Sequence, residues 1–203
     1  MGKDNSKLRT KNSEFILPMK QILFIILAFT STTLVAQNSI SLETQVYPAG
    51  IIPGIRFDLN LSDNSFLTSG IGYNFTDRQD FGKNDNEEGG GPGFSLGYAR
   101  ANFFTENLTA HIRTDLWFMD IDWEQKGLII CDPTACPNAV TRGTTEITVL
   151  QPTLGLGYNL ILSENLFLKP NLSFGYEINI KTKGREVGEG AILLGGLSFG
   201  YDF

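Results

Sequence analysis

The sequence has little of the chemistry on which catalytic and metal sites usually depend. Its 203 residues include a single His, His111, and only two Cys, Cys131 and Cys136. Neither a phosphate-binding loop nor a dinucleotide-binding fingerprint occurs in it. Two thiols alone are too few for a structural zinc site, which takes about four ligands. We therefore expect no metal, no cofactor and no catalytic residue, in a protein that is not an enzyme.

Basic patches and long apolar runs are missing as well. The chain has 16 Lys and Arg against 22 Asp and Glu, a formal net charge of −6 at pH 7. Nucleic acid is therefore not an expected partner. After Gln37 no uninterrupted apolar stretch approaches the roughly 20 residues that a transmembrane helix needs. If the chain crosses a membrane, it must cross with strands that pair into a closed barrel.

The N-terminal segment has the pattern of a secretory signal peptide. A basic start at Met19 is followed by an apolar core over residues 22–29 and by small residues that lead to Ala36. We expect residues 1–36 to be cleaved and residues 37–203 to form the folded domain. The hydrophilic residues 1–18 are interpreted as an over-long start, with an extended basic leader as the alternative.

From Gln37 onward, apolar and polar residues alternate with the period of a β-strand. In residues 166–180 the even-numbered positions are almost all Leu, Phe, Tyr or Ile, whereas Lys169 and Glu177 lie on the other face. Eight strands are predicted in this way, at residues 39–47, 51–61, 66–75, 93–104, 108–123, 146–162, 166–180 and 190–203. In the fourth strand Arg100 falls on the apolar face, and we expect a β-bulge near Ala99 to move it.

The connections between these strands alternate in length. Short turns are expected at residues 62–65, 105–107 and 163–165, and longer polar loops at residues 76–92, 126–145 and 181–189. Only the first connection, at residues 48–50, departs from the alternation. Short turns at one end and long loops at the other are typical of a transmembrane barrel.

The composition of the two faces favours a membrane barrel over a soluble one. The polar faces carry charges of both signs, which can pair inside the narrow lumen of an eight-stranded barrel. The residues expected in this lumen network are Glu43, Arg56, Asp58, His111, Arg113, Asp115, Lys169 and Glu177. Aromatic residues gather near strand ends, as in the interfacial girdles of membrane barrels. They are Tyr73, Phe75, Phe94, Phe104, Phe118, Trp123, Tyr176, Tyr201 and Phe203. A soluble periplasmic lipocalin-like carrier with an apolar interior is the alternative.

The C-terminal residues carry a resemblance to a known class. The chain ends on Phe203, with Phe199 and Tyr201 at the preceding alternate positions. This segment resembles the C-terminal signature that the barrel-assembly machinery recognises in outer-membrane proteins. Residues 37–203 resemble the small, porin-like outer-membrane protein β-barrel domain family. The resemblance implies an all-β, eight-stranded antiparallel up-and-down transmembrane β-barrel in a Gram-negative outer membrane, with lipid as its surroundings. It implies no particular activity, and we expect a monomer.

Two of the long loops carry further candidate features. Cys131 and Cys136 lie in the loop expected at residues 126–145 of an exported chain, so we expect them to form a disulfide. The loop expected at residues 76–92 is acidic, and its spacing does not match an EF-hand. We interpret it as a solvated loop, with weak calcium binding or contact with a cationic partner as the alternative. Its acidic residues are Asp77, Asp80, Asp85, Glu87 and Glu88.

Three functions are open to such a barrel. We favour a non-enzymatic structural role or binding through the loops. A narrow channel for small solutes is the second, although Arg56, Arg113 and Lys169 would crowd its lumen. An enzyme that uses His111 is the third. We interpret His111 as a hydrogen-bonded lumen residue, because it faces inward near the turn end.

Overall fold

Antiparallel strands make up almost all of the described chain. The computed structural model describes residues 38–79, 82–126 and 140–203. Its strands are β1 (Ser39–Tyr47), β2 (Gly50–Ser62), β3 (Ser65–Asp77), β4 (Asn86–Arg100), β5 (Leu108–Lys126), β6 (Val140–Tyr158), β7 (Leu160–Ile161), β8 (Leu166–Lys183) and β9 (Gly190–Asp202). No helix within these residues is long and apolar enough to cross a membrane.

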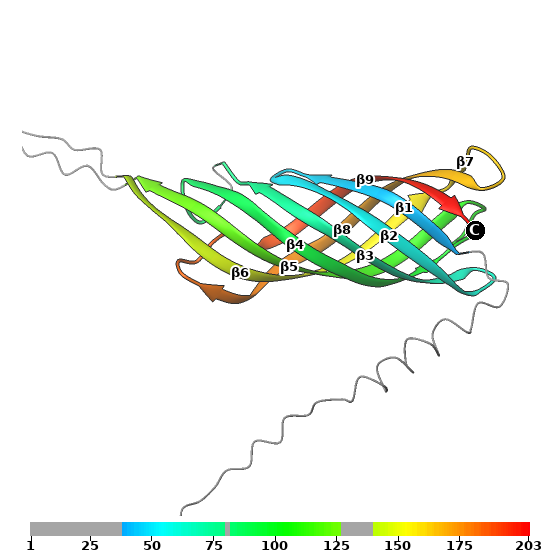
Figure 1. Ribbon diagram of the computed structural model, residues 1–203, viewed down its shortest axis with the longest axis horizontal. Coiled ribbons are helices and arrows are strands. Elements are labelled where there is room, and N and C mark those ends of the chain that lie inside the picture. Colours follow the sequence, from blue (N-terminus) through cyan, green and yellow to red (C-terminus); the bar gives the residue numbers. More distant parts are fainter. Residues whose placement is uncertain (1–37, 80–81, 127–139) are drawn as a thin grey trace, which may run out of the picture. The chain divides into compact units, whose positions relative to one another are not determined.

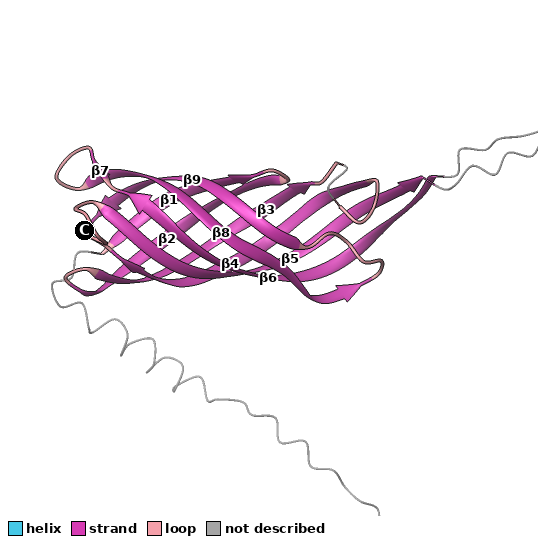
Figure 2. Ribbon diagram, turned by 180° about the vertical axis from the view of Figure 1, so that it is seen from behind, coloured by secondary structure: helices cyan, strands magenta, loops and turns pink. Residues whose placement is uncertain are grey.

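The strands close into a barrel (Figure 1). Each strand from β1 to β5 pairs with the next, β6 pairs with β8, and β9 pairs with both β8 and β1. The two-residue β7 continues β6 past Asn159 and pairs with β8 as well. The predicted ring of eight antiparallel strands is therefore confirmed, with β6 and β7 together forming the sixth predicted strand. Figure 2 shows the same closed wall from behind.

The two ends of the barrel differ. The end that holds the turns at residues 63–64, 101–107 and 162–165 is called the turn end. The end that holds residues 48–49, 78–79, 82–85 and 184–189 is called the loop end. Asn38 and Phe203 exchange two backbone hydrogen bonds at the turn end, of 2.8 and 3.0 Å, so the first and last described residues complete the wall.

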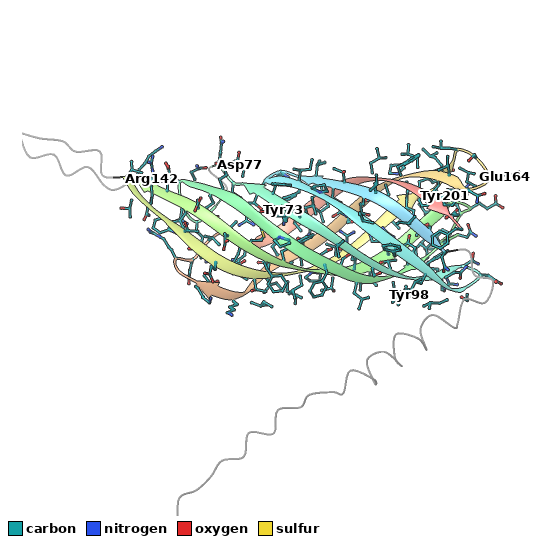
Figure 3. The ribbon with its side chains drawn as sticks, viewed as in Figure 1. Tyr73, Asp77, Tyr98, Arg142, Glu164 and Tyr201 are labelled. Atoms are coloured by element: carbon teal, nitrogen blue, oxygen red, sulfur yellow. The ribbon has the colours of Figure 1, made fainter. Side chains whose placement is uncertain are left out.

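Polar residues face the lumen and apolar residues face outward, the arrangement of a membrane barrel. In β1, Ser41, Glu43 and Gln45 are buried, whereas Leu42 and Val46 are exposed. Aromatic side chains stand on the outside towards both ends of this apolar belt. Figure 3 places Tyr98 and Tyr201 nearer the end that carries Glu164, and Tyr73 nearer the end that carries Asp77 and Arg142. A soluble carrier with an apolar interior would need the opposite arrangement.

Trp123 does not belong to this girdle, contrary to the prediction. It lies on the lumen side of β5, partly buried against the apolar core near the loop end. Its Nε1 donates a 3.1 Å hydrogen bond to Thr145 Oγ1, and the Arg185 guanidinium stacks 4.8 Å from its ring. The indole of Trp123 already has a hydrogen-bond acceptor and a cation–π partner inside the barrel, so a position at the lipid interface would offer it no further polar partner.

The strands differ greatly in length. β5 and β6 have 19 residues each, whereas β1 has nine. In Figure 1, β4, β5 and β6 consequently run well beyond the hairpin of β1 and β2 at the loop end. The fourth predicted strand, 93–104, was misplaced, because β4 begins at Asn86 and ends at Arg100. The first two long loops are correspondingly shorter than predicted.

The predicted bulge near Ala99 is wrong. β4 keeps an unbroken register with both neighbours through Arg100, whose side chain is exposed on the outer face. Arg100 is the last residue of its strand, so its long side chain can reach polar surroundings. The register shifts between Asn60 and Ser62 of β2, and a bulge is on β8, where Val149 pairs with Asn179 but Thr148 pairs with Lys181. Ile180 is therefore the extra residue.

Above the apolar belt the barrel wall reverses its polarity. On β5, Met119 and Ile121 are buried inside, whereas Asp120, Asp122 and Glu124 lie on the outer face. This loop-end part of the wall therefore has the faces of a soluble barrel, with an apolar interior and a charged exterior. Its apolar interior is formed by Tyr47, Ile52, Trp117, Met119, Ile121, Ile147, Val149, Val187, Ile192 and Leu194, which we call the apolar plug.

Candidate functional site

The centre of the lumen is filled by paired charges that come from three different strands. Glu43 on β1 accepts hydrogen bonds from Arg56 Nη1 on β2 at 3.1 Å and from Arg113 Nη1 on β5 at 2.5 Å. Arg56 Nε also binds Asp58 Oδ1 at 2.8 Å, and Arg113 Nε binds Asp115 Oδ2 at 3.1 Å. All five side chains are buried. Opposite charges in contact compensate for one another where water cannot solvate them.

Lys169 completes this cluster and makes it electrically neutral. Its Nζ lies 3.6 Å from Asp58 Oδ2, so three carboxylates face three cations. Further polar groups take up the remaining hydrogen-bonding capacity. Arg113 Nη2 donates to Gln45 Oε1 at 2.6 Å, and Ser198 Oγ donates to Glu43 Oε2 at 3.2 Å. Fully partnered buried charges hold a rigid geometry.

The apolar plug lies directly above this charged layer. Trp117 follows Asp115 on the same face of β5, and its Nε1 donates to Gln151 Oε1 at 2.9 Å. The cavity between the two layers measures only 20 Å³ and is lined by Glu43, Arg56, Arg113, Asp115 and Trp117 among others. That is room for about one water molecule. The two layers therefore fill the described lumen at two successive levels.

Two loops together form a cap at the loop end. Glu87 is fully buried, and its carboxylate accepts hydrogen bonds from the backbone N–H groups of Lys83, Asn84 and Gly188, all between 2.9 and 3.1 Å. Glu87 thus ties residues 82–85 to residues 184–189. Val187, which is 1% exposed, reaches from the second loop into the apolar plug.

Arg78 joins this cap to the barrel wall. Its Nη2 lies 2.8 Å from Glu177 Oε2 on β8, its Nη1 donates to the Gly188 carbonyl at 2.6 Å, and Glu87 Oε2 is 3.6 Å away. Glu177 was predicted to lie in the lumen network, and it is buried inside the barrel. It belongs, however, to this separate cluster near the loop end.

At the surface of the cap, Lys83 and Glu186 form an exposed ion pair of 2.9 Å. The hydrogen bond from Lys83 keeps the pKa of Glu186 below its usual range, and the same bond raises the pKa of Lys83. Solvent screens such a pair, so its contribution to the cap is small.

The prediction that residues 76–92 form a solvated acidic loop is largely wrong. Glu87 and Glu88 lie in β4, and Asp77 ends β3. The Glu87 carboxylate accepts hydrogen bonds from backbone N–H groups of the cap, and the Glu88 side chain points outward. Within the described parts of the chain, no group of three or more His, Cys, Asp or Glu is arranged to hold a metal ion. Asp80 lies outside the described residues.

The surroundings of His111 do not have the geometry of an active site. His111 Nε2 lies 3.0 Å from Ser173 Oγ, with both residues buried in the lumen. No carboxylate orients the other ring nitrogen among the hydrogen bonds of the described side chains. A Gly-x-Ser-x-Gly pattern occurs at residues 93–97, but it lies inside the regular strand β4 and not on a strand-to-helix turn.

The described structure includes only some of the remaining predicted features. Phe199 and Tyr201 lie on the outer face of β9, and Phe203 is exposed at the end of the chain. Cys131 and Cys136 lie outside the described residues, as do residues 1–37. Arg78 and Glu87 hold the cap together and Trp117 belongs to the apolar plug, but no pattern in the sequence pointed to these roles.

Comparison with known proteins supports the fold. No family model and no curated protein matches the sequence. Among solved structures, the chain is similar to a major outer membrane protein from Thermus thermophilus, with a TM-score of 0.51 and 14% identity over 84% of this chain and 100% of that one.

Two further solved structures resemble the chain more weakly. The N-terminal β-barrel domain of Pseudomonas aeruginosa OprF gives a TM-score of 0.42 at 16% identity over 83% of this chain and 98% of that one. The attachment invasion locus protein Ail of Yersinia pestis, in complex with the heparin analogue sucrose octasulfate, gives 0.44 at 10% identity over 83% and 97%. The chain has the fold of small eight-stranded outer-membrane β-barrels.

Proposed function

We propose that the protein is a closed, non-enzymatic outer-membrane barrel that presents its loop end to the outside of the cell. One observation carries this proposal: the lumen is filled at two successive levels, first by the Glu43 ion-pair cluster and then by the apolar plug. A pore or a buried catalytic site would need an opening at one of these levels. The 20 Å³ cavity between them provides none.

The part of the barrel that extends above the apolar belt supports a role outside the membrane. A protein that only spanned the lipid would not need β5 and β6 to continue past it with a charged exterior and a packed interior. Such a rigid extension holds its loops at a fixed height and orientation. This supports structural support of the envelope or binding through the loops, with the turn end in the periplasm.

A fractionation and gel experiment tests the placement in the membrane. The chain should be recovered in the outer-membrane fraction, and the unboiled protein should migrate faster than the boiled protein, because a closed barrel stays compact in detergent. A single unshifted band in the soluble periplasmic fraction would remove the proposal. Planar-bilayer recordings test the closed lumen independently, and stable openings of the wild-type barrel would favour the narrow channel.

A further inference from the structure

The barrel wall has a notch at the loop end, between β9 and β1. β9 pairs with β8 from Tyr201 up to Gly190, but its pairing with β1 stops at the pair Gly195 and Val46. Residues 190–194 therefore have no β1 partner, because β1 ends at Tyr47 and the chain turns into β2. We call this gap the β9 notch.

A pocket of 410 Å³ occupies the notch and joins the outside of the barrel to its interior. Its outer walls include Phe174, Ala191 and Leu193, which lie on the lipid-facing side of β8 and β9. Its inner walls include Arg78 and Glu177, which are buried inside the barrel. Pockets that bind small molecules have this size and this mixture of apolar walls and a few polar groups.

One carboxylate oxygen at the polar end of the pocket has no hydrogen-bond donor among the described residues. Glu177 is 6% exposed, and its Oε2 is bound by Arg78 Nη2 at 2.8 Å. Its Oε1 is buried without a hydrogen-bond partner among the described residues. A buried carboxylate oxygen without a donor is costly, so a ligand that donates to it would be bound favourably.

The charge around this end favours a cation as that donor. Arg78 lies 2.8 Å from Glu177 and 3.6 Å from Glu87, and Glu189 also lines the pocket, so carboxylates outnumber the one guanidinium here. Arg78 is already engaged with Glu177 and with the Gly188 carbonyl. An anionic headgroup would meet this excess of negative charge, whereas an ammonium group would reduce it.

We propose that the β9 notch binds an amphiphile with a protonated amine, which enters from the lipid phase. The hydrocarbon chain would lie against Phe174 and Leu193 at the lipid-facing side. The ammonium group would donate to Glu177 Oε1 at the inner end. This inference rests on the membrane placement proposed above.

Dodecylamine and dodecanoate, which share a chain and differ in headgroup charge, provide the test. The protein is extracted from its membrane and reconstituted in phosphatidylcholine nanodiscs, and each probe is titrated calorimetrically with empty nanodiscs as the blank. Dodecylamine should bind saturably and at least about tenfold more tightly than dodecanoate. Hexylamine, which stays mostly in water, should bind about tenfold more weakly than dodecylamine.

Two variants separate the contribution of the ammonium headgroup from that of the hydrocarbon chain of the amphiphile. Glu177→Gln keeps the shape of the side chain and removes its charge, so dodecylamine should bind at least about tenfold more weakly. Ala191→Trp fills the apolar wall and should abolish saturable binding while leaving Glu177 in place. The matched controls are Glu146→Gln, a carboxylate elsewhere on the outer face, and Leu197→Trp, lower on the same face of β9. Both should bind dodecylamine as the wild type does.

The outcomes distinguish this inference from the proposed function. Equal binding of dodecylamine and dodecanoate, or undiminished binding by Ala191→Trp, would overturn the amine site while the heat-modified gel shift still supports a membrane barrel. Tight binding of hexylamine would instead indicate a ligand that enters from water. A chain that does not insert into nanodiscs would contradict the membrane placement itself.

Discussion

At the scale of single residues, the interior of this barrel is organised by carboxylates that each serve several partners. Glu43 joins Arg56 and Arg113, which reach it from different strands. Glu87 joins two loops through their backbone amides. In both cases one buried acceptor fixes groups that are distant in the sequence. Removing such an acceptor therefore leaves several buried donors unsatisfied at once.

Glu43→Ala tests this for the charged layer. The variant leaves two guanidinium groups with excess positive charge in the lumen, and we expect it to lower the free energy of unfolding by about 3–5 kcal/mol. Urea unfolding of the barrel in lipid vesicles, followed by tryptophan fluorescence, measures the change. Glu146→Ala is the control, because its ion pair with Lys183 is exposed and should have little effect. Equal stability of the two variants would contradict the central role of Glu43.

Alternation placed most lumen charges on the correct face but could not assign their partners. Arg113 is recognisably inward from its position between Ile112 and Thr114, and the structure buries it. That it meets Glu43, which is 70 positions earlier, depends on the register of the whole ring. Glu87 precedes three glycines, which carry no face signal, so its acidic neighbourhood suggested a solvated loop instead.

At the scale of elements, β5 shows why the alternation of apolar residues predicted the wrong face for residues of the strand that extend beyond the lipid. Within the belt its outer residues are apolar, as at Ile112 and Phe118, whereas above the belt its inner residues are apolar, as at Met119 and Ile121. The apolar phase changes without any bulge, because the surroundings change from lipid to water. A sequence pattern records which residues are apolar and not which solvent they face. Trp123 was therefore assigned to the lipid side.

On β8, the bulge at Ile180 changes which residues face outward where the strand passes from lipid to water. Deletion of single residues tests this role of the bulge. Without Ile180, Asn179 would still face inward and Lys181 and Lys183 outward, so we expect the deletion variant to fold with a stability close to that of the wild type. Deleting Ile178 instead would turn Asn179 towards lipid. It would also break the hydrogen bond of Asn179 to the Val187 carbonyl.

The comparison of these two deletions is read from gel shift and urea unfolding. The Ile178 deletion should lose on the order of 1–3 kcal/mol for an unsatisfied polar group, whereas the Ile180 deletion should not. If both deletions were equally harmful, Ile180 would be a regular member of the ladder, and the register of β8 would need another explanation.

At the scale of the whole molecule, two closures of opposite chemistry lie in series along one lumen. The Glu43 cluster blocks passage because its paired side chains occupy the space, and the apolar plug excludes water and ions because it offers them no hydrogen bonds. We expect either layer alone to be sufficient to block conduction. The barrel would then be closed redundantly, which a channel regulated at one constriction would not be.

Redundant closure makes a specific prediction for conductance. Arg113→Ser opens space only in the charged layer and Trp117→Ala only in the plug, so each single variant should remain silent in planar-bilayer recordings, as the wild type should. The double variant removes adjacent side chains from both layers beside the 20 Å³ cavity. It should show small stepwise openings, provided that its unboiled band still migrates as a closed barrel.

Openings in a single variant would mean that one layer is already permeable and that the closure is not redundant. A silent but folded double variant would place the decisive block in the cap of Val187 and Glu87.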